Sequence, residues 1–273
     1  IPNAEIDAIS KKLMHWVTEN PTLKTSGCVN NTGEFLIKKE GALQSAIRIG
    51  FPLYTKRDKR FIDFDQPFDM ENEYIVDPRI FCIELKIPSV AEKLTEKQKI
   101  KLNNESFRWV LSQILHGEQG ALSLSASLCH ILKDPGAQEY AANQTREEAR
   151  HVTGFTNYIK ARWGTPYPAG PTLGRILEQV VSSDVVYKKI VGMQMLIEGL
   201  AMGAFGMAHQ DTNDPLLKTL LKYTMSDEAF HHKFGKIWAD RTIPKLNESE
   251  RNKVEDWSHT VFHDLLYNLV NPW

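Results

Sequence analysis

The sequence predicts an all-α protein in which four long helices form a bundle. Two observations indicate this fold. From about residue 95 onward, apolar residues recur at helical spacing and the breaks fall at short stretches rich in Pro or Gly. The same part of the chain also repeats itself at an offset of 80 residues. With 273 residues, of which 42% are hydrophobic, the chain is long enough to bury a large core.

The expected helices follow from these breaks. Long helices are predicted over residues 96–133, 136–163, 184–209 and 214–240, with a shorter helical piece over 173–181 and a terminal helix over 248–269. The first and third connections between the four long helices are tight turns, and the middle connection, between the second and third long helices, is longer. This pattern is typical of a four-helix bundle with one crossover and additional helices.

The N-terminal part has a less regular pattern. Residues 4–18 place apolar side chains on one face and are expected to form a helix, whereas 34–38 and 74–86 are ambiguous between strand and loop. No clear linker separates this part from the rest. We therefore expect residues 1–95 to be an irregular wrap or cap on the same domain, and 96–273 to be the bundle with its C-terminal helix.

The composition argues against several classes of function. Lys and Arg total 33 and Asp and Glu total 34, so no basic excess exists for nucleic-acid binding. The three cysteines are widely spaced and form no CxxC motif, which indicates a reducing, cytoplasmic setting. The first residues show no basic stretch followed by an apolar run, so no signal peptide is expected.

One apolar stretch, residues 190–208, is long enough to cross a membrane. Its only strongly polar members are Gln194 and Glu198. A carboxylate at the midpoint would be unfavourable in lipid. We therefore expect a helix buried inside a helical protein, with no membrane partner.

The internal repeat brings chemistry-bearing residues into register. At the offset of 80, the matching pairs are Glu118 and Glu198, Asp134-Pro135 and Asp214-Pro215, Glu147-Glu148 and Asp227-Glu228, and His151 and His231. Each half is thus predicted to be a helical hairpin: a helix with a Glu, a turn that begins with Asp-Pro, and a return helix with Glu-x-x-His. Of the twenty glutamates, only Glu148 and Glu228 have a His three residues on.

The spacing predicts that these side chains converge. Glu118 lies 16 residues before Asp134, and Glu148 lies 14 residues after it, so both reach about 21–24 Å from the turn. The second hairpin repeats these separations. A Glu and a His three residues apart share one helix face. Packing the two hairpins together would bring four carboxylates and two imidazoles into one layer.

Such a layer is typical of a metal centre. Four buried carboxylates without counter-ions would repel one another and take up protons. Two divalent or trivalent cations would remove that cost. Oxygen and nitrogen ligands in this proportion suit iron, with manganese as an alternative, better than zinc.

With this repeated pattern of Glu and Glu-x-x-His, residues 100–240 resemble the ferritin-like di-iron carboxylate superfamily. The segments Glu-Glu-Ala-Arg-His at 147–151 and Asp-Glu-Ala-Phe-His at 227–231 are similar to the signature boxes of its oxygen-activating branch. That branch includes bacterial multicomponent monooxygenases, acyl-carrier-protein desaturases, arylamine N-oxygenases and ribonucleotide reductase small subunits.

The resemblance implies a role for each matching residue. One iron would be bound by Glu118, Glu148 and His151, and the other by Glu198, Glu228 and His231, with Glu148 and Glu228 as bridges. Glu147 and Asp227 would accept hydrogen bonds from the ligand imidazoles.

The chain departs from each sub-branch at one position. Phe155 stands where radical-bearing reductase subunits have Tyr, Met202 where multicomponent hydroxylases have Thr, and Thr224 where arylamine N-oxygenases have His. The sequence therefore leaves hydroxylation, desaturation and N-oxygenation open.

The function expected from the resemblance is an O₂-dependent di-iron oxidoreductase. Its substrate would be a small, partly apolar organic molecule, its electron donor a ferredoxin or a reductase, and its assembly a homodimer. Met202, Gly203 and Phe155 are expected to line the substrate pocket, although Gly203 could instead allow close helix packing. Two alternatives stay open: a ferritin-like ferroxidase and iron store, and a metal-radical subunit that serves another enzyme.

Overall fold

The computed structural model describes residues 61–270. The expected helix over 4–18 and the segment 34–38 lie outside the described residues. The division into a cap over 1–95 and a bundle over 96–273 stays a prediction.

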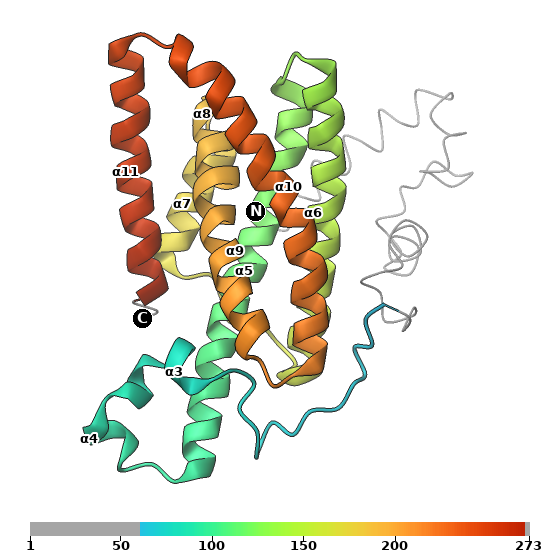
Figure 1. Cartoon of the computed structure of the whole chain (residues 1–273), viewed down its shortest axis with the longest axis vertical. Helices are drawn as coiled ribbons and strands as arrows, with labels where there is room; N and C mark the ends of the chain where they lie inside the picture. The colour runs from blue at the N-terminus through green and yellow to red at the C-terminus, as the bar shows by residue number, and fades with distance from the viewer. Residues whose placement is uncertain (1–60, 271–273) are drawn as a thin grey trace, which may run out of the picture. The chain divides into compact units, whose positions relative to one another are not determined.

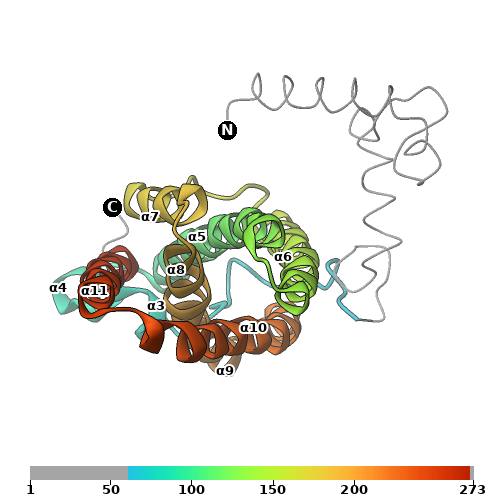
Figure 2. The ribbon, with the colours of Figure 1, turned by 90° about the horizontal axis from the view of Figure 1, so that it is seen from above.

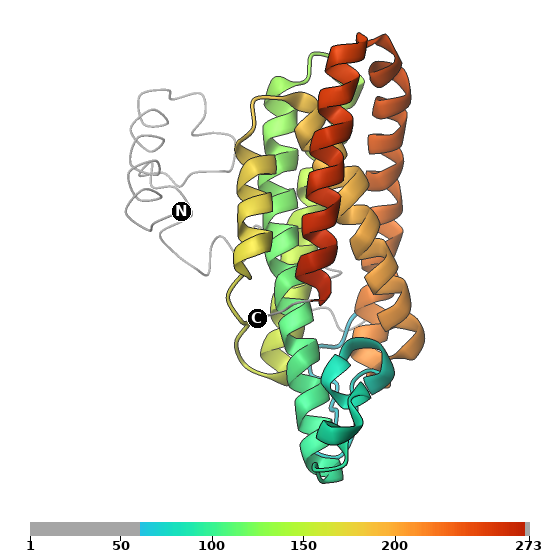
Figure 3. The ribbon, with the colours of Figure 1, turned by 90° about the vertical axis from the view of Figure 1, so that its left-hand side faces the viewer.

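The described part of the chain is all-α, which confirms the predicted fold class. Its long helices are α5 (Glu96–Ile131), α6 (Pro135–Arg162), α9 (Glu198–Asp211), α10 (Pro215–Thr242) and α11 (Glu248–Val270). Shorter elements connect them: α7 (Pro171–Ser182), α8 (Val186–Lys189), the π-helix η5 (Ile190–Ile197) and η6 (Ile243–Lys245). Helices α5, α6, α9 and α10 lie side by side (Figures 1 and 2). Helix α7 packs against α5, and α11 packs against α7 and η5 (Figure 3).

Both Asp-Pro pairs begin a helix, as the repeat predicts. Asp134 accepts a hydrogen bond from the amide of Ala137 at 2.8 Å, and Asp214 accepts one from Leu216 at 3.0 Å. In each helix a Pro occupies the first turn, where its missing N–H is no loss. These caps fix the starting points of α6 and α10, and thereby the depth of the residues that follow.

The two caps differ in their surroundings. Asp134 is exposed, whereas Asp214 is fully buried. The Asp214 carboxylate also accepts hydrogen bonds from Arg162 at 2.7 and 3.0 Å and from the Tyr158 hydroxyl at 2.8 Å. The second cap is therefore part of a buried ion pair that ties α6 to α10.

Residues 61–95 fold against the ends of these helices. The ambiguous segment 74–86 forms one antiparallel bridge, between Val76 and Thr212, followed by two helical turns. The short helices here are α3 (Pro78–Phe81), η4 (Ile83–Lys86) and α4 (Pro88–Ala91). Asn104 of α5 accepts from the Ile75 amide at 2.9 Å and donates to the Glu73 carbonyl at 3.0 Å. Ile75 itself is fully buried.

Two apolar clusters build the core. The first contains Phe107, Phe155, Phe205 and Leu217, and the second contains Leu128, Ala141 and Met193 among others. Along α5, α6, α9 and α10 the predicted acidic residue falls between the two clusters: on α5, for example, Leu115 belongs to the first, Ala121 to the second, and Glu118 lies between. The core is thus divided by one polar layer halfway along the helices.

The apolar stretch before Glu198 differs from the expectation of one regular helix over 184–209. Residues Ile190–Ile197 form a π-helix, in which each turn holds an extra residue. Among the described residues, the continuous helical span Val186–Asp211 is long and apolar enough to cross a membrane, and 39% of its most apolar window is buried.

Candidate metal centre

The structure brings all six predicted ligands together in the polar layer. Two groups of potential ligand atoms form, each with all atoms within 4.8 Å of one another. They are Glu118, Glu148, His151 and Glu228 in one group, and Glu148, Glu198, Glu228 and His231 in the other. Glu148 and Glu228 belong to both groups, so two metal ions held here would be adjacent and share these carboxylates. The bridging positions match the expectation.

The ligands are shielded from water. Glu148, His151 and His231 are fully buried, Glu228 is 2% exposed, and Glu118 is 6% exposed. They come from four different helices: α5, α6, α9 and α10. Because each carboxylate is positioned by a long helix rather than by a loop, the layer is rigid.

The Nδ1 atoms of the two imidazoles face the carboxylates. His151 Nδ1 lies 2.9 Å from Glu228 Oε1 and 3.2 Å from Glu118 Oε2. His231 Nδ1 lies 3.1 Å from both Glu148 Oε1 and Glu228 Oε2. The two rings have their centroids 6.0 Å apart. Each Nδ1 is therefore the nitrogen that would bind a metal.

The opposite nitrogens are held by acids from the other half of the repeat. His151 Nε2 donates to Asp227 Oδ2 at 3.1 Å, and His231 Nε2 donates to Glu147 Oε2 at 3.0 Å. A carboxylate can only accept here, so Nε2 keeps its proton, and Nδ1 is the nitrogen that would bind a metal once the metal displaces the proton held there by the acids. The structure thus places Glu147 and Asp227 where the resemblance implied, with each acid serving the imidazole on the opposite helix.

Arg150 links these two acids. Its guanidinium lies 2.9 Å from Asp227 Oδ2 and 3.4 Å from Glu147 Oε1. Burial would raise the pKa of Asp227, but the hydrogen bond from His151 and the charge of Arg150 lower it below the ordinary value. Asp227 therefore stays ionised and keeps its acceptor role. The repeat does not extend to this arginine, because position 230 is an exposed Phe.

The buried carboxylates of the layer repel one another, and cations would balance their negative charge. Burial raises the pKa of Glu118 and of Glu198 well above the ordinary value, and neighbouring carboxylates add to the effect. Burial alone would lower the pKa of His151, but the surrounding acids, Glu118 foremost, raise it well above the ordinary value. Protons thus balance the carboxylates where no metal does so. Metal ions would replace those protons.

Three buried oxygens in the described layer support the same conclusion. Glu198 Oε2 has no hydrogen-bond partner, and Glu148 Oε2 and Glu228 Oε1 both lie against the single atom His151 Nδ1, at 3.3 and 2.9 Å. A buried carboxylate oxygen without a donor is unfavourable by several kcal/mol. Because these oxygens belong to three of the predicted ligands and cluster with the imidazoles, the residues fit two metal ions.

Two buried amides, Gln144 and Gln194, complete the layer, and neither was among the residues predicted for the site. Gln144 Nε2 donates to Glu148 Oε1 and to Glu198 Oε1, both at 3.0 Å. Gln194 Nε2 in turn donates to Gln144 Oε1 at 2.7 Å. Each Gln lies one turn before a ligand Glu, and this spacing is the signal that could have found them. The repeat has Thr224 in place of Gln144, so the amides surround one metal position only.

The π-helix orients Gln194 with support from α10. His232 Nδ1 donates to the Gln194 carbonyl at 3.0 Å. Gly235 lets α10 approach closely, because a Cβ there would lie 2.9 Å from the Gln194 Cβ. His232 is thus a backbone partner, and it belongs to neither group of potential ligands. The same is true of His116, whose Nε2 donates to the Tyr167 carbonyl at 2.9 Å.

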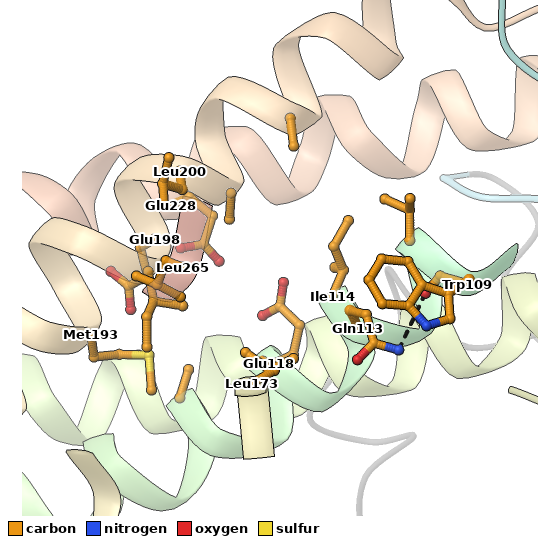
Figure 4. A pocket seen from close by; sticks show the side chains of 16 residues that line it. Trp109, Gln113, Ile114, Glu118, Leu173, Met193, Glu198, Leu200, Glu228 and Leu265 are labelled. Atoms are coloured by element: carbon orange, nitrogen blue, oxygen red, sulfur yellow. Dashed lines mark hydrogen bonds between the residues drawn. The ribbon is translucent and has the colours of Figure 1, made fainter. Parts of the chain in front are cut away.

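An apolar cavity of about 120 Å³ adjoins the acids (Figure 4). Glu118, Glu198 and Glu228 line one end of it, and most other lining residues are apolar. The figure shows these three carboxylates facing one another, with Ile114 and Trp109 farther along α5.

The three residues expected to line this pocket lie elsewhere. Phe155 is fully buried in the first core cluster, with its ring centroid 5.7 Å from that of Phe205. Met202 lines neither this cavity nor the larger one beside it, and Gly203 lines only the larger one. The reason is the helix face that borders the cavity: Ile197, Ala201 and Ala204 line it, whereas Met202 and Gly203 do not.

No family model, curated protein or solved structure matches this chain. What the fold and the site define is therefore a class: an all-α protein with a buried layer of carboxylates and imidazoles that could hold two adjacent metal ions.

Proposed function

We propose that this protein is a non-haem di-iron oxidoreductase of the ferritin-like type, which uses O₂ to oxidise a small, mainly apolar organic molecule. One observation carries the proposal: a bridged ligand set for two metals borders a cavity with apolar walls. The ligand set alone would also suit an iron store. The apolar cavity against Glu118, Glu198 and Glu228 provides a place for an organic substrate.

Two iron ions bound in the layer would supply the electrons that reduce O₂. The residues of the chain would hold and orient them. Glu148 and Glu228 would bridge, and the imidazoles, fixed by Asp227 and Glu147, would each bind one metal through Nδ1. Gln144 would keep Glu148 and Glu198 in position by donating one N–H group to each side.

The cavity would exclude water from the substrate. Ile197, Ala201 and Ala204 form its α9 wall, and Ile114 and Ala121 contribute from α5. Water exclusion protects reactive species from quenching and strengthens the electrostatic interactions of the layer. An external donor such as a ferredoxin or a reductase would supply electrons for repeated turnover.

The proposal is tested by loading metal-free protein with Fe²⁺ under anaerobic conditions, removing excess iron and mixing with O₂. We expect two irons per chain and a transient visible absorption, which a true substrate makes decay faster. Accumulation of many irons per chain would favour the alternative of an iron store. A fully loaded, reduced protein that does not consume O₂ would contradict the oxidoreductase.

A further inference from the structure

A second cavity lies directly beside the first. Its volume is about 400 Å³, and its walls come from α3, η4, α5 and α9. Four residues line both cavities and so form the wall between them: Trp109 and Val110 on α5, and Leu200 and Ala204 on α9. We call the first the inner cavity and the second the outer cavity.

We propose that the outer cavity is the entrance and second half of the substrate site. The substrate would be an elongated, mainly apolar molecule whose far end passes Trp109 into the inner cavity. This inference rests on the proposed function and names the shape and chemistry of its substrate.

The inner cavity is suited to one end of such a molecule. Along α5 it is lined from Trp109 past Glu118 to Ala121, and the span from Trp109 to Glu118 alone is nine residues or about 13 Å (Figure 4). Besides the acids, the polar side chain on its wall is Gln113, which donates to the Pro168 carbonyl at 3.1 Å and accepts from the Gly170 amide at 2.7 Å. Its polar atoms are thus occupied, and the remaining walls are apolar.

The sizes of the cavities indicate that they act together. The inner volume of about 120 Å³ is well below the ~300–1,000 Å³ of common small-molecule sites. The outer cavity, at about 400 Å³, lies within that range. A substrate that fills both would place one end beside the carboxylates, where oxidation is proposed, and keep most of its surface in the outer cavity.

The mouth of the outer cavity is mixed in character. Ile83 and Met207 are 55% and 46% exposed there, although both are apolar. Glu84, Lys86 and Ser106 provide polar groups at the same cavity. A molecule with an apolar chain and a polar head would therefore leave its head at the mouth.

Two glycines of α9 provide a matched test. A Cβ added at Gly203 or at Gly206 would meet nothing within 4 Å, so a larger side chain fits at either position. Gly203 lines the outer cavity, whereas Gly206 lines neither cavity. Gly203→Leu would fill the entrance, and Gly206→Leu would make the same helix substitution without doing so.

The experiment measures binding of hexan-1-ol, octan-1-ol and decan-1-ol by calorimetry, with the metal content of each sample verified and without turnover. For the parent protein, affinity should rise about fourfold for each added methylene, as expected for ~0.8 kcal/mol per buried CH₂. Gly203→Leu should weaken binding of decan-1-ol at least tenfold. Gly206→Leu should leave it within twofold.

Parent-like affinity of Gly203→Leu would overturn the inference, and so would equal losses in both variants. A protein that loads two irons and reacts with O₂ but binds no alkanol would refute this inference alone. Chain-length-dependent binding by a protein that never reacts with O₂ would refute the proposed function instead.

Discussion

At the scale of single residues, orientation of the imidazoles decides what the layer can bind. His151 and His231 each have one nitrogen fixed by a carboxylate from the opposite return helix, at 3.1 and 3.0 Å. A rotated or doubly protonated ring could not present Nδ1 to a metal. The acids next to the ligands are therefore part of the site, although they lie too far out to bind a metal themselves.

Removing a carboxylate that belongs to both ligand groups should lower metal binding at both positions. Glu148→Ala takes a ligand from both groups, whereas Glu118→Ala takes a ligand from one. We expect metal analysis to show well under one iron per chain for the first and about one for the second. Glu139→Ala, an exposed change on the same helix, should keep two. If Glu148→Ala binds two metals as tightly as the parent, the bridging assignment is wrong.

Removing the charge of one acid that orients a ligand imidazole should weaken metal binding at one of the two metal positions. Asp227→Asn removes the charged acceptor of His151 Nε2 but leaves Glu147 in place. Loss of such a partner lowers metal affinity by about 10–100-fold. Competition with a chelator should therefore reveal one weakened and one parent-like metal. Uniform weakening of both would show that Arg150 couples the two supports.

The six ligands could be found from the sequence because helical spacing fixes both depth and face, and the two supporting acids were implied by the resemblance of the boxes at 147–151 and 227–231. For Gln144 and Gln194 the sequence signal is weaker: each lies one turn before a ligand Glu, but this spacing does not show where the amide points. Their amides matter only because α6 and η5 face each other, and that contact depends on how the hairpins pack. Met202 lines neither cavity and Gly203 lines only the outer one, for a related reason: an almost uniformly apolar helix does not reveal which face is inward.

At the scale of elements, the two helix caps should differ in energy although the sequence makes them equivalent. Asp134→Ala removes an exposed cap and should lower the free energy of unfolding by about 1 kcal/mol. Asp214→Ala also leaves Arg162, whose side chain is 5% exposed, without its ionic partner, and should cost about 3–5 kcal/mol.

Urea denaturation of the two variants at equal metal content measures this difference. The exposed variant serves as the control for loss of a cap alone. Equal costs would show that the buried pair of Asp214 and Arg162 contributes no more than a surface cap.

The π-helix is the element that the sequence could not predict. Helical periodicity is read from the alternation of polar and apolar positions, and residues 190–197 contain a single polar side chain. The extra residue per turn of a π-helix therefore does not change the pattern of polar and apolar residues in this stretch. The other long helices were predicted to within a few residues, because Asp-Pro caps and polar faces mark them.

At the scale of the whole molecule, the polar layer crosses the middle of the core, so metal should stabilise the fold. A ligand present at 1,000 times its dissociation constant adds about 4 kcal/mol per site. For a domain of this size each filled site corresponds to a rise of roughly 8–16 °C in Tm, so two filled sites correspond to about twice that rise. Calorimetry of chelator-treated and reloaded protein should show this difference. Equal melting temperatures would indicate that the layer binds metal weakly or not at all.

The assembly is expected to be small. An oxidoreductase of this type needs no shell, and we predict a homodimer. Exposed apolar side chains on α10 and α11, among them Phe230 at 64% and Phe262 at 43%, offer surface for such contacts. Light scattering after size exclusion measures the mass. A shell of 24 subunits would contradict the prediction and favour the iron store.

The exchange of acids between the two return helices has a consequence for how such a chain could have arisen. If both halves descend from one hairpin, that ancestor carried both an imidazole and an acid, but its acid could orient only the imidazole of a second copy. Two copies had to associate before either bound metal well. After fusion into one polypeptide, the two halves could have diverged. One such difference is Arg150 in the first half, where the matching position in the second half is an exposed phenylalanine.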